Sequence, residues 1–216
     1  MTQINTPFSW SLFNNAPIVG IIRGLTKENT LDIAKTFLEA ELYTLEVTMN
    51  TDGATQLISE LRNQFPTLNV GAGTVCTIND CETAIASGAQ FIVTPIIDEE
   101  VIQYCVAKNI PIFPGAYTPS EIHKAWSLGA SAVKVFPATQ LGPKYIKDVL
   151  APLNEIKLLP TGGVSKENIA SFFKVGAIGV GMGSSLLHKQ YVESKNFTAL
   201  KEHFIQIKQQ IQDFTT

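Results

Sequence analysis

The sequence has few of the features that mark secreted or membrane proteins. Its three cysteines are an odd number and include no CxxC pair, so no disulfide framework is expected and the reducing cytoplasm is the predicted location. The first 22 residues contain no Lys or Arg, and the apolar run over residues 16–22 is short. We therefore predict neither a signal peptide nor a membrane span.

Charge is also scarce. Only 16% of the 216 residues are charged and the formal net charge is −3, without the basic stripe that is typical of nucleic-acid-binding proteins. We expect no nucleic-acid partner and no membrane partner. His123, His188 and His203 are scattered along the chain, so no metal site is predicted. A small anionic substrate is compatible with this balance, because local donors can outweigh a mildly acidic surface.

The pattern that is present is an alternation of short β-branched runs with longer segments of helical period. Strands are predicted at 18–22, 44–48, 69–71, 91–94, 111–113, 132–135, 157–159 and 178–181. Helices are predicted near 27–40, 52–65, 78–87, 99–108, 119–128, 143–150, 166–175 and 197–213. Gly88, Gly129 and Gly176 each follow a helical segment, as glycines that terminate helices do.

Eight strands separated by helices imply βαβ units and a parallel sheet. The length suits an α/β protein with one domain, a (β/α)₈ TIM barrel over residues 1–216. Residues 1–15 are expected to form an N-terminal helix or arm that closes the barrel bottom. The alternative fold is an open doubly wound sheet, but the regular spacing and the lack of an early GxGxxG fingerprint argue against it.

Two charged residues interrupt apolar strands near the ends where barrel enzymes carry their catalytic groups. They are Glu46 in TLEVT and Lys134 in AVKVF. Side chains alternate across a strand, so the flanking Leu and Val residues would face the helices, and both charged side chains would point into the barrel. Burial should lower the pKa of the Lys134 amine, which suits a Schiff-base nucleophile. A structural ion pair between Lys134 and Glu46 is the alternative interpretation.

Glycine-rich segments, PTGGV at 160–164 and GMGSS at 181–185, follow the seventh and eighth predicted strands. Loops at these positions of a barrel often bind phosphate through backbone N–H groups. The predicted phosphate-binding residues are Gly162, Gly163, Gly183 and Ser184, and Thr161 is a further predicted substrate-binding residue. The alternative is that these glycines only make tight turns.

Thr74 and Arg23 are two further candidates for the barrel mouth. The segment GAGTV at 71–75 has little side-chain bulk and places the Thr74 hydroxyl after the third strand. Arg23 ends the first strand, where its guanidinium could bind a carboxylate in a bidentate manner. A surface salt bridge is the alternative role for Arg23.

Taken together, these motifs resemble those of the 2-dehydro-3-deoxy-phosphogluconate / 4-hydroxy-2-oxoglutarate aldolases. The resemblance runs from about residue 17 to residue 187. It rests on seven segments in order: LEVT (45–48), VGAGTV (70–75), FIVTP (91–95), PGAYTP (114–119), VKVFP (133–137), PTGGV (160–164) and GS (183–184). The resemblance implies a small trimeric barrel enzyme, a homotrimer that uses a lysine Schiff base and neither metal nor cofactor.

The resemblance also implies a role for each residue. Lys134 would form the imine and Glu46 would act as general acid and base, while Thr74, Pro95 and Phe136 would line the pyruvyl pocket. The implied reaction is that of a lyase of carbohydrate metabolism. It cleaves the phosphorylated 2-keto-3-deoxy sugar acid 2-dehydro-3-deoxy-6-phosphogluconate to pyruvate and D-glyceraldehyde 3-phosphate. It also cleaves 4-hydroxy-2-oxoglutarate to pyruvate and glyoxylate.

One position departs from the gluconate-type pattern. Asn50 stands where those enzymes usually carry an Arg that helps to hold the substrate carboxylate. The related galactonate-type aldolases are similar in having Asn at this place and an Ile-x-Arg-Gly segment like residues 21–24. Arg23 is then expected to hold the carboxylate, and either C4 epimer, the gluconate or the galactonate form, is a possible substrate. A different phosphate-binding barrel, an isomerase or a transferase, would share the glycine-rich loops but not the paired Lys and Glu.

Overall fold

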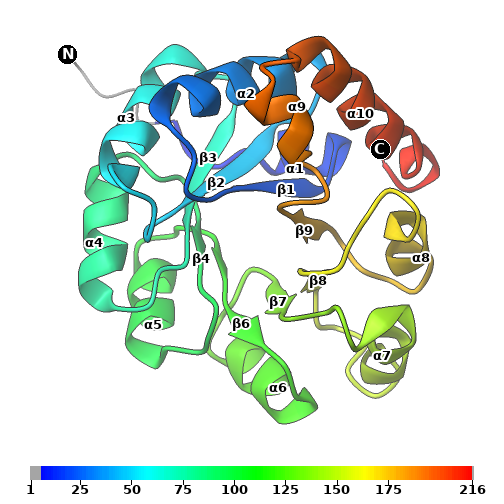
Figure 1. The fold of residues 1–216 in the computed structure, drawn as a ribbon. Coiled ribbons are helices and arrows are strands. Elements are labelled where there is room, and N and C mark those ends of the chain that lie inside the picture. The colour runs from blue at the N-terminus through cyan, green and yellow to red at the C-terminus, as the bar shows by residue number, and fades with distance from the viewer. Residues whose placement is uncertain (1–5, 216) are drawn as a thin grey trace.

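Parallel strands with helices packed outside them make up residues 6–215, the part of the chain that the computed structural model describes (Figure 1). The strands are β1 (Ile18–Ile22), β2 (Thr44–Thr48), β3 (Asn69–Gly73), β4 (Ile92–Val93), β5 (Ile112–Phe113), β6 (Gly115–Ala116), β7 (Val133–Val135), β8 (Leu158–Pro160) and β9 (Val180–Met182). The helices are α1 (Trp10–Asn15), α2 (Lys27–Glu39), α3 (Ala54–Gln64), α4 (Ile78–Ala86), α5 (Glu99–Ala107), α6 (Pro119–Ser127), α7 (Gly142–Leu150), α8 (Ile169–Lys174), α9 (Lys189–Glu193), α10 (Phe197–Gln209) and the 3₁₀ helix η1 (Gln212–Phe214).

The strands belong to two parallel sheets. One has the order β5-β4-β3-β2-β1-β9 and the other the order β6-β7-β8. The predicted α/β class is therefore confirmed, but the hydrogen bonding differs from the predicted single sheet of eight strands. The break between β5 and β6 falls at Pro114, which has no N–H to donate to a neighbouring strand. On the side of β8 and β9, a bridge between Thr161 and Gly181 and a hydrogen bond from Ile178 N to the Leu158 carbonyl oxygen at 3.0 Å join the two sheets.

Local sequence determines where most helices begin and end. The hydroxyls of Thr77 and Thr118 accept hydrogen bonds from the backbone N–H three residues later, in capping boxes at the starts of α4 and α6. Gly88, Gly129 and Gly176 have φ values of 99°, 97° and 101°, a conformation that glycine adopts without strain. The prediction that these three glycines terminate helices is confirmed.

The buried apolar residues form an outer and an inner cluster. The outer cluster lies between strands and helices and includes Leu45 and Val47 of β2. The inner cluster is mainly aromatic: its members are Phe8, Phe13, Val19, Phe91, Val93, Phe113, Ala132 and Leu159. Ring centroids of Phe8 and Phe91 are 5.3 Å apart, and those of Phe13 and Phe113 are 6.3 Å apart.

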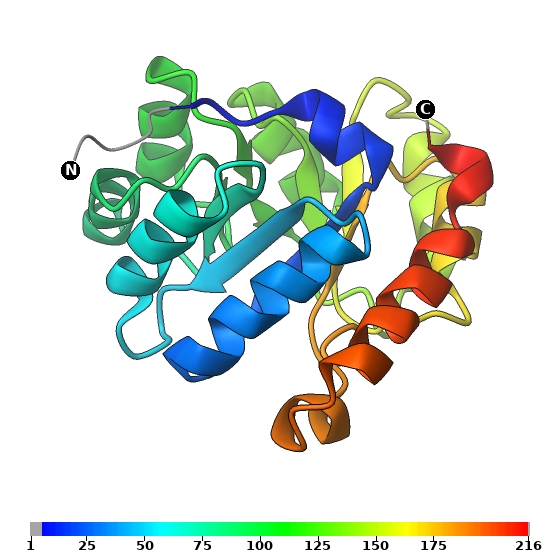
Figure 2. The ribbon, with the colours of Figure 1, turned by 90° about the horizontal axis from the view of Figure 1, so that it is seen from above.

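The N-terminal segment supplies two aromatic members of this inner cluster, Phe8 and Phe13. Phe13 lies on α1 and is fully buried, and Phe8 precedes that helix. In Figure 2 the dark blue N-terminal segment and the orange α9 lie at opposite ends of the strands. The predicted N-terminal helix is present as α1, and its role in closing the bottom of a barrel stays a prediction; residues 1–5 lie outside the described part. Within residues 6–215, no helix has the length and apolar character needed to cross a bilayer.

Candidate active site

Lys134 and Glu46 lie on different sheets and are both buried. Lys134 is in β7, where it pairs with Gly115 and Leu159, and Glu46 is in β2, where it pairs with Ile21 and Gly71. Their exposed fractions are 5% and 2%. Their apolar neighbours along each strand belong to the outer cluster (Leu45, Val47, Val133 and Val135). The predicted alternation is confirmed, because the charged side chains take the face opposite to the helices.

Burial changes the protonation chemistry of the lysine. Desolvation lowers the pKa of Lys134, and the nearby charge of Arg23 lowers it further, whereas Glu46 and Cys76 act in the opposite direction. The Lys134 Nζ lies 4.7 Å from the centroid of the Phe136 ring, a contact that favours the charged form. The buried site therefore increases the neutral fraction of this amine, which is the nucleophilic form.

The carboxyl group of Glu46 is shifted toward neutrality as well. Burial raises its pKa to about 7, although the positive charges of Lys134 and Arg23 act in the opposite direction. A carboxyl group with a pKa near the working pH can both take up and return a proton. Gly73 makes room for it, since a Cβ atom at that position would lie 2.5 Å from the Glu46 Cδ.

The two groups influence one another without direct contact. Among the ion pairs of the described residues, none joins Lys134 to Glu46. The alternative role, an ion pair that closes the barrel, therefore has no support in the structure. Two such groups, held apart, could each act on a bound substrate.

Arg23 reaches this centre from the end of β1. Its Nη2 donates a hydrogen bond to the Thr74 Oγ1 at 3.2 Å, and its charge acts on both Lys134 and Glu46. Thr74 is half-buried after β3 and has a φ of 54°. Asn50, in contrast, is exposed on the loop after β2. No hydrogen bond or ion pair of residues 6–215 joins Asn50 to Lys134, Glu46 or Arg23.

Pro95 and Phe136 face one cavity of about 470 Å³, which Ala116 and Tyr117 also line. Because the Phe136 ring contacts the Lys134 amine as well, this cavity adjoins the buried lysine. The structure thus places Pro95 and Phe136, the two apolar members of the predicted pyruvyl pocket, on a common cavity.

The glycine-rich segments follow β8 and β9, as expected. Gly162 and Gly163 have φ values of 91° and 75°. At Gly163 a Cβ atom would lie 2.8 Å from the Thr139 Cα, so the close approach of backbone excludes a side chain. The hydroxyl of the buried Thr161 lies against Gly181, where an added Cβ atom would meet the Thr161 Cβ at 3.1 Å.

Gly183 and the exposed Ser184 line a second cavity of about 600 Å³ together with Arg23. Its outer wall comes from α9, through Lys189 and Val192. This short helix has no clear signal in the sequence pattern and was not predicted. Cys76, a half-buried thiol whose charge state affects Lys134, was not predicted either; the only available signal was its position two residues after Thr74.

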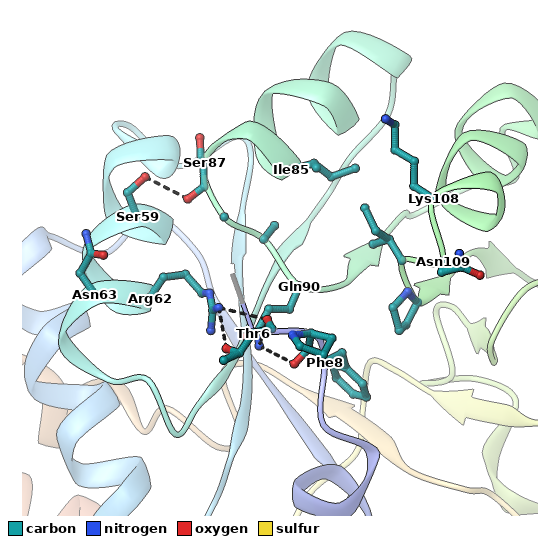
Figure 3. Close-up of a pocket in the computed structure, with 15 residues that line it drawn as sticks. Thr6, Phe8, Ser59, Arg62, Asn63, Ile85, Ser87, Gln90, Lys108 and Asn109 are labelled. Carbon is teal, nitrogen blue, oxygen red and sulfur yellow. Dashed lines mark hydrogen bonds between the residues drawn. The ribbon is translucent and has the colours of Figure 1, made fainter. Parts of the chain in front are cut away.

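A further cavity of about 510 Å³ lies at the amino ends of β4 and β5, away from all of these residues (Figure 3). There Arg62 Nη2 donates to the Thr6 Oγ1 at 2.9 Å, and Gln90 Nε2 donates to the carbonyl oxygen of Pro7 at 3.0 Å. These hydrogen bonds anchor the segment that carries Phe8. The cavity holds none of the predicted site residues.

Comparison with known proteins is consistent with this geometry. Residues 10–203 match the family model described as KDPG and KHG aldolase. A 2-dehydro-3-deoxy-phosphogluconate aldolase of Haemophilus influenzae is 34% identical over 181 residues, which are 83% of this chain and 85% of that protein. A 2-dehydro-3-deoxy-6-phosphogalactonate aldolase of Escherichia coli K12 is also 34% identical, over 79% of this chain and 84% of that protein.

One solved structure is informative about chemistry. The KDPG aldolase of Legionella pneumophila, with pyruvate captured as a covalent carbinolamine intermediate, superposes with a TM-score of 0.80. The two chains are 26% identical, and the match covers 95% of this chain and 97% of that one.

Proposed function

The chain belongs to the KDPG and KHG aldolase family, whose relatives are carbon–carbon lyases, and from this premise we propose a specific reaction for it. The proposed reaction is Schiff-base cleavage of 2-dehydro-3-deoxy-6-phosphogluconate to pyruvate and D-glyceraldehyde 3-phosphate. The same site would cleave 4-hydroxy-2-oxoglutarate to pyruvate and glyoxylate. The observation that carries the proposal is the buried Lys134 amine, with its lowered pKa, near the buried Glu46 carboxyl group.

The first step is formation of an imine. The neutral amine of Lys134 forms a bond to C2 of the substrate and, with uptake of one proton, the C2 oxygen leaves as water. The product is a protonated imine that can accept an electron pair. Arg23 holds the carboxylate at C1. The pyruvyl carbons are surrounded by Thr74, Pro95 and Phe136. Asn50 is a further substrate contact at the mouth of the site.

Glu46 then carries the proton for the cleavage step. Its carboxylate takes the proton from the C4 hydroxyl, the C3–C4 bond breaks, and the electron pair moves to the imine nitrogen. The aldehyde leaves and an enamine of pyruvate remains on Lys134. Glu46 returns its proton to C3, and water hydrolyses the resulting imine to release pyruvate and the free lysine.

The phosphate group would lie against the glycine-rich segments. Gly162, Gly163 and Gly183 allow close approach to backbone N–H groups, and Thr161 and Ser184 add hydroxyl groups. This part of the site is needed for the phosphorylated substrate only. The imine chemistry needs nothing from it.

Reductive trapping tests the proposal. Incubation with pyruvate and borohydride should reduce the imine to a stable secondary amine, and peptide mapping should find the adduct on Lys134. An adduct on another lysine, or no adduct, would show that the assignment is wrong. The Lys134→Arg variant should release no pyruvate from either substrate, whereas Lys157→Arg, a change at the lysine that directly precedes β8, should retain activity.

The galactonate epimer is the second candidate substrate, because the E. coli phosphogalactonate aldolase is as similar as the gluconate enzyme and Asn50 replaces the expected Arg. Pyruvate release from both epimeric phosphosugar acids, measured side by side, decides between them. A higher kcat/KM for the galactonate form would overturn the primary assignment.

We also propose that residues 1–216 form one closed eight-stranded barrel, with β5 and β6 as two parts of one strand interrupted at Pro114. The bridge between Thr161 and Gly181 supports closure at the other seam. The proposed assembly is a homotrimer in the cytoplasm. Membership of the family supports the trimer, and the three free cysteines support a reducing compartment. Light scattering would test the trimer.

A further inference from the structure

A buried hydroxyl connects the loop that carries Arg23 to the neighbouring loop. The backbone N–H of Gly24 donates a hydrogen bond to the Thr51 Oγ1 at 3.0 Å. The Thr51 Oγ1 is also 2.9 Å from the Thr48 Oγ1. These contacts join the end of β1 to the turn after β2, within which Asn50 also lies.

Thr51 itself is held firmly. Its exposed fraction is 4% and that of Thr48 is 0%. Its backbone N–H donates to the Thr48 carbonyl oxygen at 2.8 Å, and its own carbonyl oxygen accepts from Ala54 N at 3.1 Å. Because its backbone and its hydroxyl group are both hydrogen-bonded within this turn, Thr51 can hold the Gly24 amide in a fixed position.

The backbone beside Arg23 borders open space at Gly24. Gly24 has a φ of 63°, and an added Cβ atom there would meet nothing within 4 Å. At its other end, the Arg23 guanidinium is held by the hydrogen bond to the Thr74 Oγ1. Thr51 thus restrains the backbone beside Arg23, and Thr74 restrains its head group.

We propose that Thr51 is a positioning residue for Arg23, so that the guanidinium is in place before the carboxylate of the 2-keto acid arrives. This inference rests on the proposed function, in which Arg23 binds that carboxylate. Thr51 does not touch the substrate. It acts through the Gly24 amide, and it matters equally for every substrate that shares the pyruvyl end.

The test is the Thr51→Val variant, which keeps the shape of the side chain and removes its hydrogen bonds. The KM for the phosphorylated sugar acid and the KM for 4-hydroxy-2-oxoglutarate should both rise about 3- to 10-fold, with kcat within about 2-fold of wild type. Thr51→Ser keeps the hydroxyl and should restore both KM values. Thr30→Val is the matched control: Thr30 is fully buried in α2, and its Oγ1 has no hydrogen-bond partner among the described residues.

A pH profile separates positioning from simple loss of stability. The charged groups that act on Glu46 are Lys134 and Arg23, and Lys134 also faces Cys76. Arg23 lowers the pKa of Glu46, so its displacement in Thr51→Val should move the acidic limb of kcat/KM to higher pH. A variant that is merely less stable would keep the wild-type limb.

Several results would overturn the inference. These are unchanged KM values in Thr51→Val, a rise for the phosphorylated substrate alone, or a fall in kcat at constant KM. If Thr51→Val does not fold, Thr48→Val, which removes one of the two hydrogen bonds, should raise both KM values by about 2-fold, and unchanged values there would refute the idea. A wild-type protein that neither traps nor releases pyruvate would instead refute the proposed function.

Discussion

Gly73 gives the sharpest test of how closely Glu46 must be placed. A Cβ atom on Gly73 would lie 2.5 Å from the Glu46 Cδ, whereas carbon atoms in ordinary contact are about 3.5–4.0 Å apart. In Gly73→Ala the carboxyl group must therefore move by about 1 Å. The carboxyl group is the end of a flexible side chain, so the free energy of unfolding should fall by no more than about 1 kcal/mol.

Activity should respond far more strongly than stability. A displacement of about 1 Å in a reacting group can reduce the rate on the order of 100-fold, so we expect such a fall in kcat for pyruvate release. Trapping of pyruvate on Lys134 by borohydride should persist, because the lysine is not displaced. Steady-state kinetics, mass mapping and thermal unfolding measure the three quantities.

Gly71, two residues earlier on the same face of β3, provides the control. There an added Cβ atom would lie 2.5 Å from the Phe91 Cζ in the inner aromatic cluster. Gly71→Ala should therefore destabilise the protein by about 1–3 kcal/mol while the folded fraction keeps most of its kcat. If Gly73→Ala retains wild-type kcat, or loses as much stability as Gly71→Ala, the reasoning about Glu46 is wrong.

Three further predictions follow from the site and the core. Because burial raises the pKa of Glu46 to about 7 from 4.5, the folded state loses stability as pH rises from about 4.5 to about 7. In urea unfolding, the free energy of unfolding of Glu46→Gln should rise relative to that of the wild type by about 3 kcal/mol between about pH 4 and about pH 8. Its kcat should be strongly reduced. A difference in free energy that stays constant with pH would contradict the assigned burial. Ser184→Ala should raise KM about 10-fold for the phosphorylated substrate and leave that for 4-hydroxy-2-oxoglutarate unchanged; equal effects would remove Ser184 from the phosphate site. Phe13→Ala should lower the free energy of unfolding by about 3–5 kcal/mol, and a loss below about 1 kcal/mol by denaturant titration would show that the N-terminal helix does not complete the inner cluster.

Much of this fold could be predicted because the signals are local. The bounds of β1 and β2 match the prediction to the residue. Both are short and rich in β-branched residues, and β1 lies between Pro17 and Gly24, which act as breakers. Alternation along β2 and β7 was enough to place Glu46 and Lys134 on the inner face. The helix-ending glycines were equally accessible, because their role depends only on a positive φ.

The remaining features depend on contacts that a single segment does not encode. The helix α9 has five residues, too few for stability by itself, and it packs on α10, where the ring centroid of Tyr191 lies 6.4 Å from that of His203. The approach of Cys76 to Lys134 depends on which strands face one another across the interior. Asn50 was included by resemblance alone, and the structure leaves it exposed.

The aromatic residues packed in the interior also bear on the order in which the two products leave. Phe8, Phe13, Phe91, Phe113 and Ala132, which lies two residues before Lys134, belong to the inner cluster. The N-terminal segment that supplies two of them lies at the end of the strands opposite to α9. On that side of the buried Lys134 amine the interior is filled by apolar side chains, so we expect the substrate to enter from the opposite end. In the proposed cleavage, the three-carbon piece bound to nitrogen is the deeper of the two fragments, so the aldehyde must depart first and pyruvate last.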